Sequence, residues 1–176
     1  MSNRKFSIQD LCAVGIFTAI ITICAQLSIP MPYGVPMTLQ TFAVLLSGIV
    51  LGAKKGALST LVYVLLGAVG VPVFANFTGG LGIVFGPTGG FILSFPLMAL
   101  AAGIGGSKNK KLLLVAGLVA GAALNYICGV LFFSLIMSAD IGTAITVCVL
   151  PFILTDIIKI VLAAVLGKRV SGGRFY

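Results

Sequence analysis

The sequence predicts an all-α integral membrane protein with six transmembrane helices, and its composition and the placement of its charges both support this fold class. Of its 176 residues, 60% are hydrophobic and 8% are charged, whereas about a quarter of the residues of a soluble domain are charged. Six helices of about 20 residues each require on the order of 120 residues in the bilayer. The remaining residues suffice for short loops, so we expect one membrane-embedded domain over residues 1–176.

Ten of the eleven lysine and arginine residues lie in breaks between long apolar runs, and only in every second break. The other breaks, near residues 30–37, 71–88 and 138–142, contain no lysine or arginine. Cytoplasmic loops are enriched in these residues, so the alternation predicts an even number of spans with the N and C termini in the cytoplasm. The basic residues in the breaks are Arg4, Lys5, Lys54, Lys55, Lys108, Lys110, Lys111, Lys168, Arg169 and Arg174.

The predicted spans follow from the apolar runs between these breaks. They cover residues 8–29, 38–53, 56–74, 89–106, 112–137 and 145–167.

The fifth span carries a stripe of small residues at four-residue spacing. Gly117, Gly121, Asn125 and Gly129 share one helical face, and such stripes let membrane helices approach closely. The amide of Asn125 requires hydrogen-bond partners in a dry environment, which either a ligand or a neighbouring helix supplies.

The sixth span contains two charged residues, Asp156 and Lys159. At about 100° per residue they share a helical face with Phe152 and Ala163. Facing lipid, the two charges would together cost roughly 5–7 kcal/mol on an insertion scale, so we expect them to face the bundle or water. They form either an ion pair that fixes the rotation of the helix or part of a functional site, the commoner role of ionisable residues inside membranes.

The break over residues 70–91 is long, uncharged and rich in glycine and aromatic residues. An ordinary external loop is more polar, and irregular backbone near the membrane is tolerated where it packs on protein or lines a cavity. We therefore predict a mobile apolar lid over a site, with a flexible linker as the alternative.

The composition argues against an enzyme and against a nucleic-acid-binding protein. Histidine and glutamate are absent, which removes the usual metal ligands and most general acids and bases. Residues 86–90, Gly-Pro-Thr-Gly-Gly, lack the Gly-Lys-Ser/Thr ending of a phosphate-binding loop. The basic residues are spread over four sites rather than gathered on one face. We expect no catalytic residues, no cofactor, no metal site and no nucleic-acid partner.

Four sequence blocks carry a resemblance to a known family. They are Val-Pro-Met-Thr-Leu-Gln-Thr at 35–41, Gly-Val-Pro-Val-Phe at 70–74, Gly-Pro-Thr-Gly-Gly-Phe at 86–91 and Asp-Ile-Ile-Lys at 156–159. In these blocks the chain resembles BioY, the biotin-binding S component of energy-coupling-factor (ECF) transporters. Phe91 departs from the family pattern, in which tyrosine is expected, so a hydroxyl group is missing at this position.

The resemblance implies a multi-pass protein of the bacterial plasma membrane that captures biotin from outside. It also implies association with a transmembrane coupling subunit and two ATPase subunits. In that family a small-residue motif on the first helix serves docking, and Gly15 and Ala19 match it here.

The resemblance also implies a biotin site in which Asp156 accepts a ureido N–H group. Lys159 would then offset negative charge, either on Asp156 or on the biotin carboxylate. Phe74, Phe77 and Phe85 of the predicted lid would cover the bicyclic ring. The further candidates for polar contacts are Asn125, Asn76, Gln40, Thr88 and Tyr126.

Two other function classes stay open on the sequence. A self-sufficient secondary transporter would use Asp156 and Lys159 for proton coupling, and it predicts uptake into proteoliposomes driven by a pH gradient without partners. A small structural or regulatory membrane protein would use the pair to fix helix register, and it predicts no ligand.

Overall fold

Apolar runs interrupted by glycine, proline and lysine fold into helices in a computed structural model that describes residues 7–31, 34–107 and 110–171. The predicted basic residues Arg4, Lys5, Lys108 and Arg174 lie outside the described residues. The longer helices are α1 (Ile8–Gln26), α2 (Gln40–Leu51), α3 (Ala53–Ala68), α5 (Gly89–Gly106), α6 (Lys111–Met137) and α8 (Ile153–Val170).

Shorter elements join these helices. They are β1 (Ser28–Ile29), β2 (Met37–Thr38), the 3-10 turn η2 (Ala75–Phe77), α4 (Leu81–Val84) and α7 (Ile141–Cys148). The two strands pair antiparallel, with Ser28 opposite Thr38.

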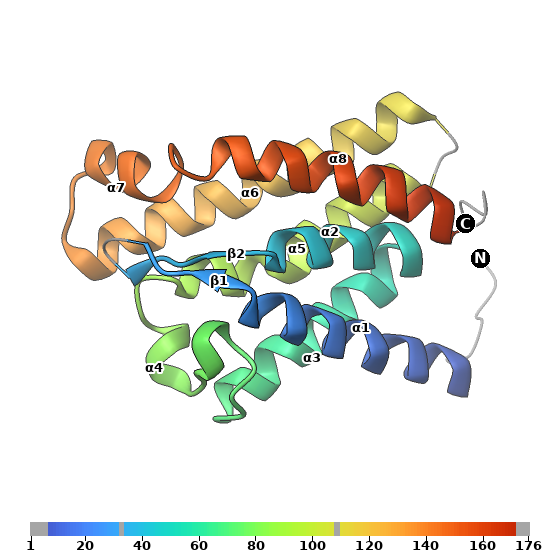
Figure 1. Ribbon diagram of the computed structural model, residues 1–176, viewed down its shortest axis with the longest axis horizontal. Helices are drawn as coiled ribbons and strands as arrows, with labels where there is room; N and C mark the ends of the chain where they lie inside the picture. The colour runs from blue at the N-terminus through green and yellow to red at the C-terminus, as the bar shows by residue number, and fades with distance from the viewer. Residues whose placement is uncertain (1–6, 32–33, 108–109, 172–176) are drawn as a thin grey trace.

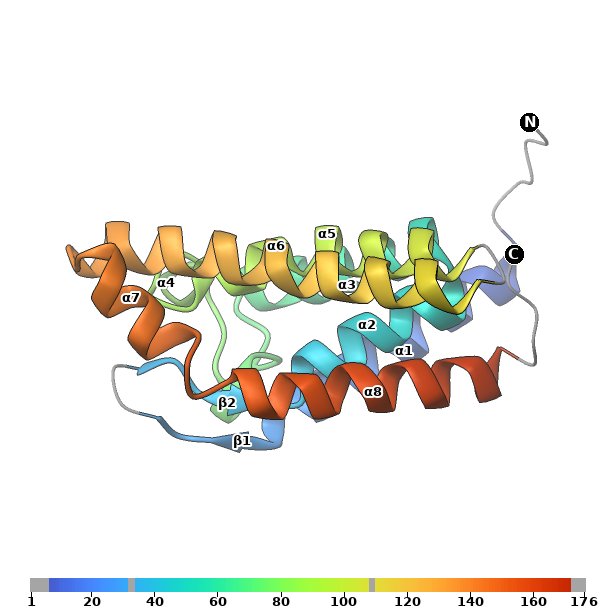
Figure 2. The ribbon, with the colours of Figure 1, turned by 90° about the horizontal axis from the view of Figure 1, so that it is seen from above.

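The longer helices lie in two layers, one containing α8, α2 and α1 and the other containing α6, α5 and α3 (Figures 1 and 2). The buried core lies between the layers. Val44 and Leu45 of α2 belong to the same buried cluster as Phe95 and Met98 of α5. The central position of α2 and α5 explains why both helices contain many fully buried side chains.

The glycine stripe of α6 packs against α5. A Cβ atom at Gly117 would lie 2.7 Å from Gly105 Cα, and one at Gly121 would lie 2.9 Å from the carbonyl oxygen of Met98. Only glycine permits so close an approach of the two backbones, so the predicted packing role of this stripe is confirmed.

The described basic residues of the breaks gather at one end of the bundle. Figure 1 places the start of α1, the α2–α3 junction, the end of α5, the start of α6 and the end of α8 at this end. Gly52, with φ +79°, makes the tight turn between α2 and α3. The clustering is what the alternation of the breaks requires. The basic residues concerned are Lys54, Lys55, Lys110, Lys111, Lys168 and Arg169.

Among the described residues, three helices are long and apolar enough to cross a membrane: α1, α5 and α6. The pair α7 and α8 makes a fourth if it is counted as one span. The chain is therefore a multi-pass membrane protein. Since α2 has 12 residues and α3 has 16, the count of six complete spans stays a prediction.

The predicted span over residues 145–167 is not one continuous helix. α7 ends at Cys148, α8 begins at Ile153, and their axes are bent by 54°. Pro151 lies in the break. Proline has no N–H group to donate, and its ring clashes with the preceding turn of a helix, so the helix stops before it.

The predicted spans 8–29 and 56–74 are too long at their ends. α1 ends at Gln26, and the chain then enters β1. α3 ends at Ala68, because Gly70 adopts φ +103° and Pro72 follows it. Phe74 turns back onto Tyr63, with the two rings edge to face and their centroids 5.5 Å apart. The chain over 69–80 therefore becomes part of the site instead of a helix.

Candidate functional site

A cavity of about 270 Å³ lies between the two helix layers. It is formed by the starts of α2, α5 and α8, by the second half of α6 and by the loop after α3, and thus lies toward the end opposite the basic residues (Figure 1). Its apolar walls include Val35, Phe74, Phe91, Ile92, Phe95 and Phe152. In residues 7–31, 34–107 and 110–171, no cluster of three or more metal-ligating His, Cys, Asp or Glu side chains is present.

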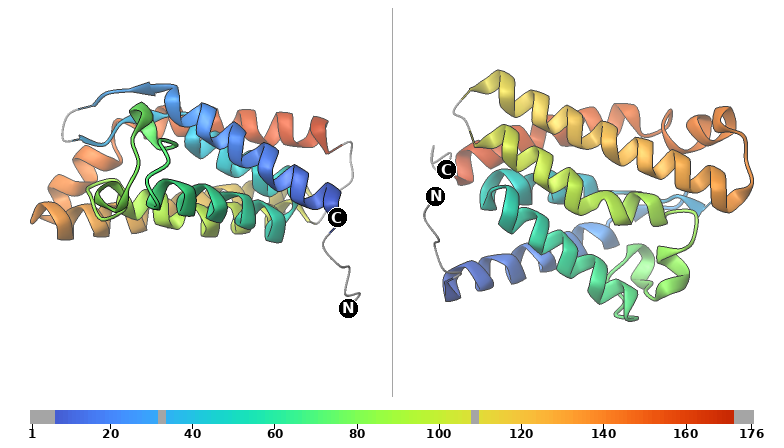
Figure 3. Two further views of the ribbon diagram at one scale, coloured as in Figure 1. Left: turned by 90° about the horizontal axis from the view of Figure 1, so that it is seen from below. Right: turned by 180° about the vertical axis from the view of Figure 1, so that it is seen from behind.

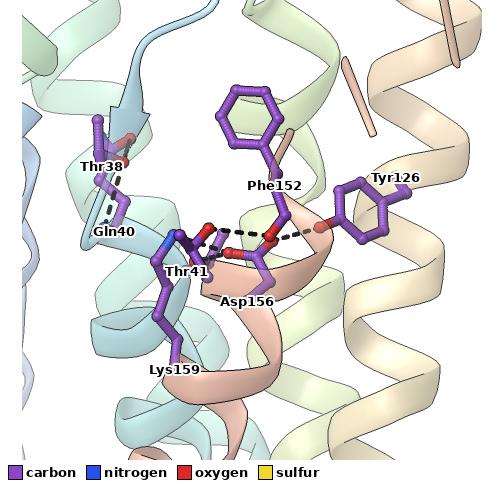
Figure 4. A network of polar contacts seen from close by, with 8 residues as sticks. Thr38, Gln40, Thr41, Tyr126, Phe152, Asp156 and Lys159 are labelled. Atoms are coloured by element: carbon purple, nitrogen blue, oxygen red, sulfur yellow. Dashed lines mark hydrogen bonds and ion pairs between the residues drawn. The ribbon is translucent and has the colours of Figure 1, made fainter. Parts of the chain in front are cut away.

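The charged pair of α8 faces this cavity. Asp156 and Lys159 are 8% and 5% exposed, so the prediction that they face the bundle is confirmed. Lys159 Nζ donates to Asp156 Oδ1 at 2.7 Å. Figure 4 shows the carboxylate at the meeting point of three helices.

Two further donors hold the Asp156 carboxylate. Tyr126 of α6 donates its hydroxyl to Oδ2 at 2.6 Å, and Thr41 of α2 donates to Oδ1 at 3.3 Å. A buried carboxylate is tolerated when it is both paired and hydrogen-bonded. Three donors from three helices thus fix the position of this carboxylate in the cavity wall.

Asn125 is 3% exposed, and its side-chain amide lies between α5 and the cavity. Its Nδ2 donates to the carbonyl oxygen of Phe91 at 2.9 Å and to Ser94 Oγ at 2.7 Å. Its Oδ1 accepts from none of the described residues. Since no buried side-chain oxygen of those residues lacks a partner, this oxygen keeps contact with the cavity. Asn125 therefore offers a hydrogen-bond acceptor in a fixed orientation.

The amide of Gln40 lines the cavity but is already paired within the protein. Its Nε2 donates to the hydroxyl of Tyr63, and its Oε1 accepts from Thr38 Oγ1 at 3.0 Å. Thr38 lines the cavity and Tyr63 is fully buried in the core, so Gln40 helps to fix the start of α2.

Asn76 and Thr88 both line the cavity. Asn76 Oδ1 accepts from Ser28 Oγ at 2.6 Å, and its NH₂ group donates to none of the described residues. Thr88 is half-buried at the start of α5. Together with Asp156, Lys159, Asn125, Gln40, Phe74 and Tyr126, they complete the sequence-predicted residues that the fold brings together.

Phe77 and Phe85 do not reach the cavity. They are 73% and 62% exposed, and Phe77 has a positive φ of 55°. Phe91, Phe95 and Phe152 form the aromatic walls in their place. Phe91 and Phe95 are spaced four residues apart, as expected for one face of a helix, but nothing in the sequence shows which helix that face meets.

Thr41 is a site residue that the prediction missed. It lies directly after Gln40, in the block at 35–41 that carries the family resemblance. Its contact with Asp156 joins residues 115 positions apart, so only the fold reveals it.

The two predicted docking residues lie on the outer face of α1. Gly15 and Ala19 are exposed, and a Cβ atom at Gly15 would meet nothing within 4 Å. The side chains of α1 that pack into the bundle lie on its other face, among them Val14, Phe17 and Ile21. The geometry leaves the small-residue face accessible, and its docking role stays a prediction.

Comparison with known proteins assigns the family. The family model described as BioY matches residues 1–173. This chain belongs to the BioY family. A biotin transporter BioY of Thermotoga maritima is 44% identical over 164 residues, which cover 93% of this chain and 96% of that protein. A probable biotin transporter BioY of Pyrococcus horikoshii is 39% identical over 164 residues, which cover 93% and 97%.

A solved structure agrees with the BioY assignment. The crystal structure of the S-component for biotin from an ECF-type ABC transporter superposes with a TM-score of 0.85 and 26% sequence identity. The match covers 98% of this chain and 95% of that chain. The family resemblance in the four sequence blocks is thereby confirmed.

Proposed function

We propose that this chain is the biotin-binding S component of an ECF-type ABC importer. The observation that carries the proposal is a fixed carboxylate, Asp156, beside a buried lysine and the open acceptor of Asn125 in an otherwise apolar cavity. Pockets for small ligands are mostly apolar with a few placed polar groups. The biotin transport named for the relatives and the biotin S-component structure support the same ligand.

The chemistry of biotin matches these groups one by one. The two ureido N–H groups are donors, which Asn125 Oδ1 and the Asp156 carboxylate can accept. The ureido carbonyl and the valerate carboxylate are acceptors, which the remaining N–H groups of Lys159 and the NH₂ group of Asn76 can serve. The bicyclic ring lies against the aromatic walls. A ligand that lacked one of these groups would leave a buried partner unpaired, so the site should reject look-alikes strongly.

The proposal includes an orientation. The end that carries the basic residues faces the cytoplasm together with both termini, as the enrichment of lysine and arginine in cytoplasmic loops favours. The cavity then opens toward the outside of a bacterial plasma membrane. The chain itself binds biotin and catalyses no reaction. A transmembrane coupling subunit docks at Gly15 and Ala19. Two ATPase subunits supply the energy for transport.

Equilibrium binding of labelled biotin to the purified chain tests the ligand. The protein is stripped of co-purified ligand in detergent, and unlabelled thiamine and riboflavin serve as competitors. We expect saturation near one biotin per chain that neither competitor reduces. A folded protein that binds no biotin would contradict the proposal. Uptake into proteoliposomes driven by a pH gradient without partners would favour the secondary transporter instead.

Substitution on the outer face of α1 tests the docking surface. Ala19→Leu adds bulk where the partner is proposed to lie, so biotin uptake by cells that contain the coupling module should fall severely while biotin binding to the purified chain stays unchanged. The matched control is Ala120→Leu, which adds the same bulk at an exposed position of α6. Equal uptake by the two variants would contradict docking at this face.

A further inference from the structure

The side chain of Gln26, in the last turn of α1, forms hydrogen bonds with the backbone of the loop over residues 73–78. Its Nε2 donates to the carbonyl oxygens of Val73 and Phe74, at 3.3 and 3.0 Å. Its Oε1 accepts from the backbone N–H of Phe77 at 2.8 Å. One amide group thus ties both arms of the loop, and the left view of Figure 3 shows the loop reaching the junction of α1 and β1.

The loop over residues 73–78 has an unfavourable backbone conformation. Asn76 and Phe77 are consecutive non-glycine residues with φ of 58° and 55°. The left-handed region is sparsely populated by residues other than glycine, because the Cβ atom crowds the backbone. A bridge between Phe74 and Thr78, together with hydrogen bonds from the backbone N–H and the hydroxyl of Thr78 to the carbonyl oxygen of Ala75, closes the loop on itself. The contacts with Gln26 add three hydrogen bonds that fix this shape against α1.

The same loop is a wall of the ligand cavity, whereas Gln26 is not. Phe74, Ala75, Asn76 and Thr78 line the cavity. Any effect of Gln26 on a ligand must therefore pass through the loop. A second tie, from Ser28 Oγ to Asn76 Oδ1 at 2.6 Å, comes from the residue that begins β1. The two ties join the loop to the junction of α1 and β1.

We propose that Gln26 is a positioning residue that holds residues 73–78 closed over the ligand and so sets how long the ligand stays bound. The inference rests on the proposed function for the identity of the ligand. Since a wall that opens more often releases a bound molecule without changing how it is recognised, the effect falls on dissociation.

The test compares Gln26→Met with Thr22→Val in the full-length purified chain. Methionine keeps the length of the side chain and removes its hydrogen bonds. Thr22 lies one turn earlier on α1, and its hydroxyl donates to the carbonyl oxygen of Thr18 in the same helix at 3.0 Å, without touching the loop. In Gln26→Met we expect labelled biotin to dissociate about tenfold faster, with the association rate changed less than about twofold. Thr22→Val should retain the wild-type rates.

Gln26→Glu provides a second variant that retains polarity. It keeps an acceptor for the Phe77 N–H group but loses the donors to the carbonyl oxygens of Val73 and Phe74. Because a carboxylate is repelled by these two carbonyl oxygens, the dissociation rate of this variant should also exceed that of the wild type. If Gln26→Met fails to fold, this variant decides the inference.

Hydrogen exchange of the ligand-free protein tests, without biotin, whether Gln26 holds the loop over residues 73–78 in place. Peptides that cover residues 73–80 should exchange faster in Gln26→Met than in the wild type or in Thr22→Val. If the wild type binds biotin, the inference would be overturned by a Gln26→Met variant whose exchange in this segment, or whose biotin dissociation rate, equals that of the wild type. The proposed function would then still stand. A wild type that binds no biotin refutes the proposed function. The exchange rates alone then decide whether Gln26 holds residues 73–78 in place.

Discussion

Two Asp–Lys ion pairs of similar length lie in different surroundings in this protein. Lys55 and Asp10 join α3 to α1 at the basic end, with an N–O distance of 2.5 Å and side chains 34% and 24% exposed. Lys159 and Asp156 lie in the cavity wall, 2.7 Å apart, with side chains 7% and 12% exposed. Exposed pairs contribute little to stability, whereas breaking a buried pair leaves an uncompensated charge. Burial, and not the pairing itself, distinguishes the site from the scaffold.

The third acid, Asp140, shows yet another use of the same residue type. It caps α7 by accepting from the backbone N–H and the hydroxyl of Thr143, at 2.9 and 2.7 Å. These hydrogen bonds hold the pKa of Asp140 below its usual value. The three acids of the chain thus cap a helix, tie two helices together and furnish a candidate ligand site.

Of all the substitutions at the two ion pairs, Asp156→Asn should have the largest effect on biotin binding. The change leaves Lys159 buried without its carboxylate partner and replaces the charged acceptor proposed for a ureido N–H group with a neutral amide. We expect biotin affinity to fall by about a hundredfold or more, as measured by equilibrium binding. Unchanged affinity in a folded variant would mean that the pair is structural.

A double substitution separates binding from stability. Breaking a buried ion pair costs about 3–5 kcal/mol, whereas replacing both charges with uncharged groups is often close to neutral. Asp156→Asn combined with Lys159→Met should therefore recover the thermal stability lost in Asp156→Asn while biotin binding stays weak. If binding returned together with stability, the charges would not serve the ligand.

The donors around Asp156 should matter less than the carboxylate. Tyr126→Phe removes the 2.6 Å hydrogen bond to Oδ2, and we expect biotin affinity to fall about tenfold because a bond to a charged group is lost. Thr41→Val removes the longer contact at 3.3 Å and should cost about twofold. Competition binding with unlabelled biotin resolves both changes, and a larger effect at Thr41 would contradict this ranking.

The smallest effect is expected at the other pair. Asp10→Asn removes the ion pair with Lys55 at a site where water solvates both groups. Biotin affinity should change by less than about twofold. A loss comparable to that of Asp156→Asn would mean that the two pairs are not distinguished by burial.

The fold was predictable where local pattern and charge set the boundaries. The spans 89–106 and 112–137 agree with α5 and α6 to within one residue, because glycine marks both ends of α5 and lysine marks the start of α6. The predicted face of α8 is also correct, since Phe152, Asp156 and Lys159 are all buried. Helical periodicity is a local property, and these features depend on nothing else.

The features that sequence reasoning missed depend on contacts between distant segments. The Thr41–Asp156 hydrogen bond, the pairing of Gln40 with Tyr63 and the return of Phe74 onto Tyr63 each require two elements to meet. The outward turn of Phe77 follows from a positive φ at a non-glycine residue, which composition does not indicate. Apart from Phe74, the identity of the aromatic walls was therefore beyond the sequence.

The break at residues 149–152 has an electrostatic consequence for the site. It makes the wall of the cavity the beginning of a helix, and Asp156 lies in the first turn of α8. The aligned peptide dipoles of a helix place a partial positive charge at its N-terminus, which stabilises a nearby carboxylate by about 0.3–1 kcal/mol. A continuous span would have placed Asp156 in mid-helix, beyond the reach of this field. By interrupting the helix, Pro151 adds the backbone itself to the groups that favour the negative charge of Asp156.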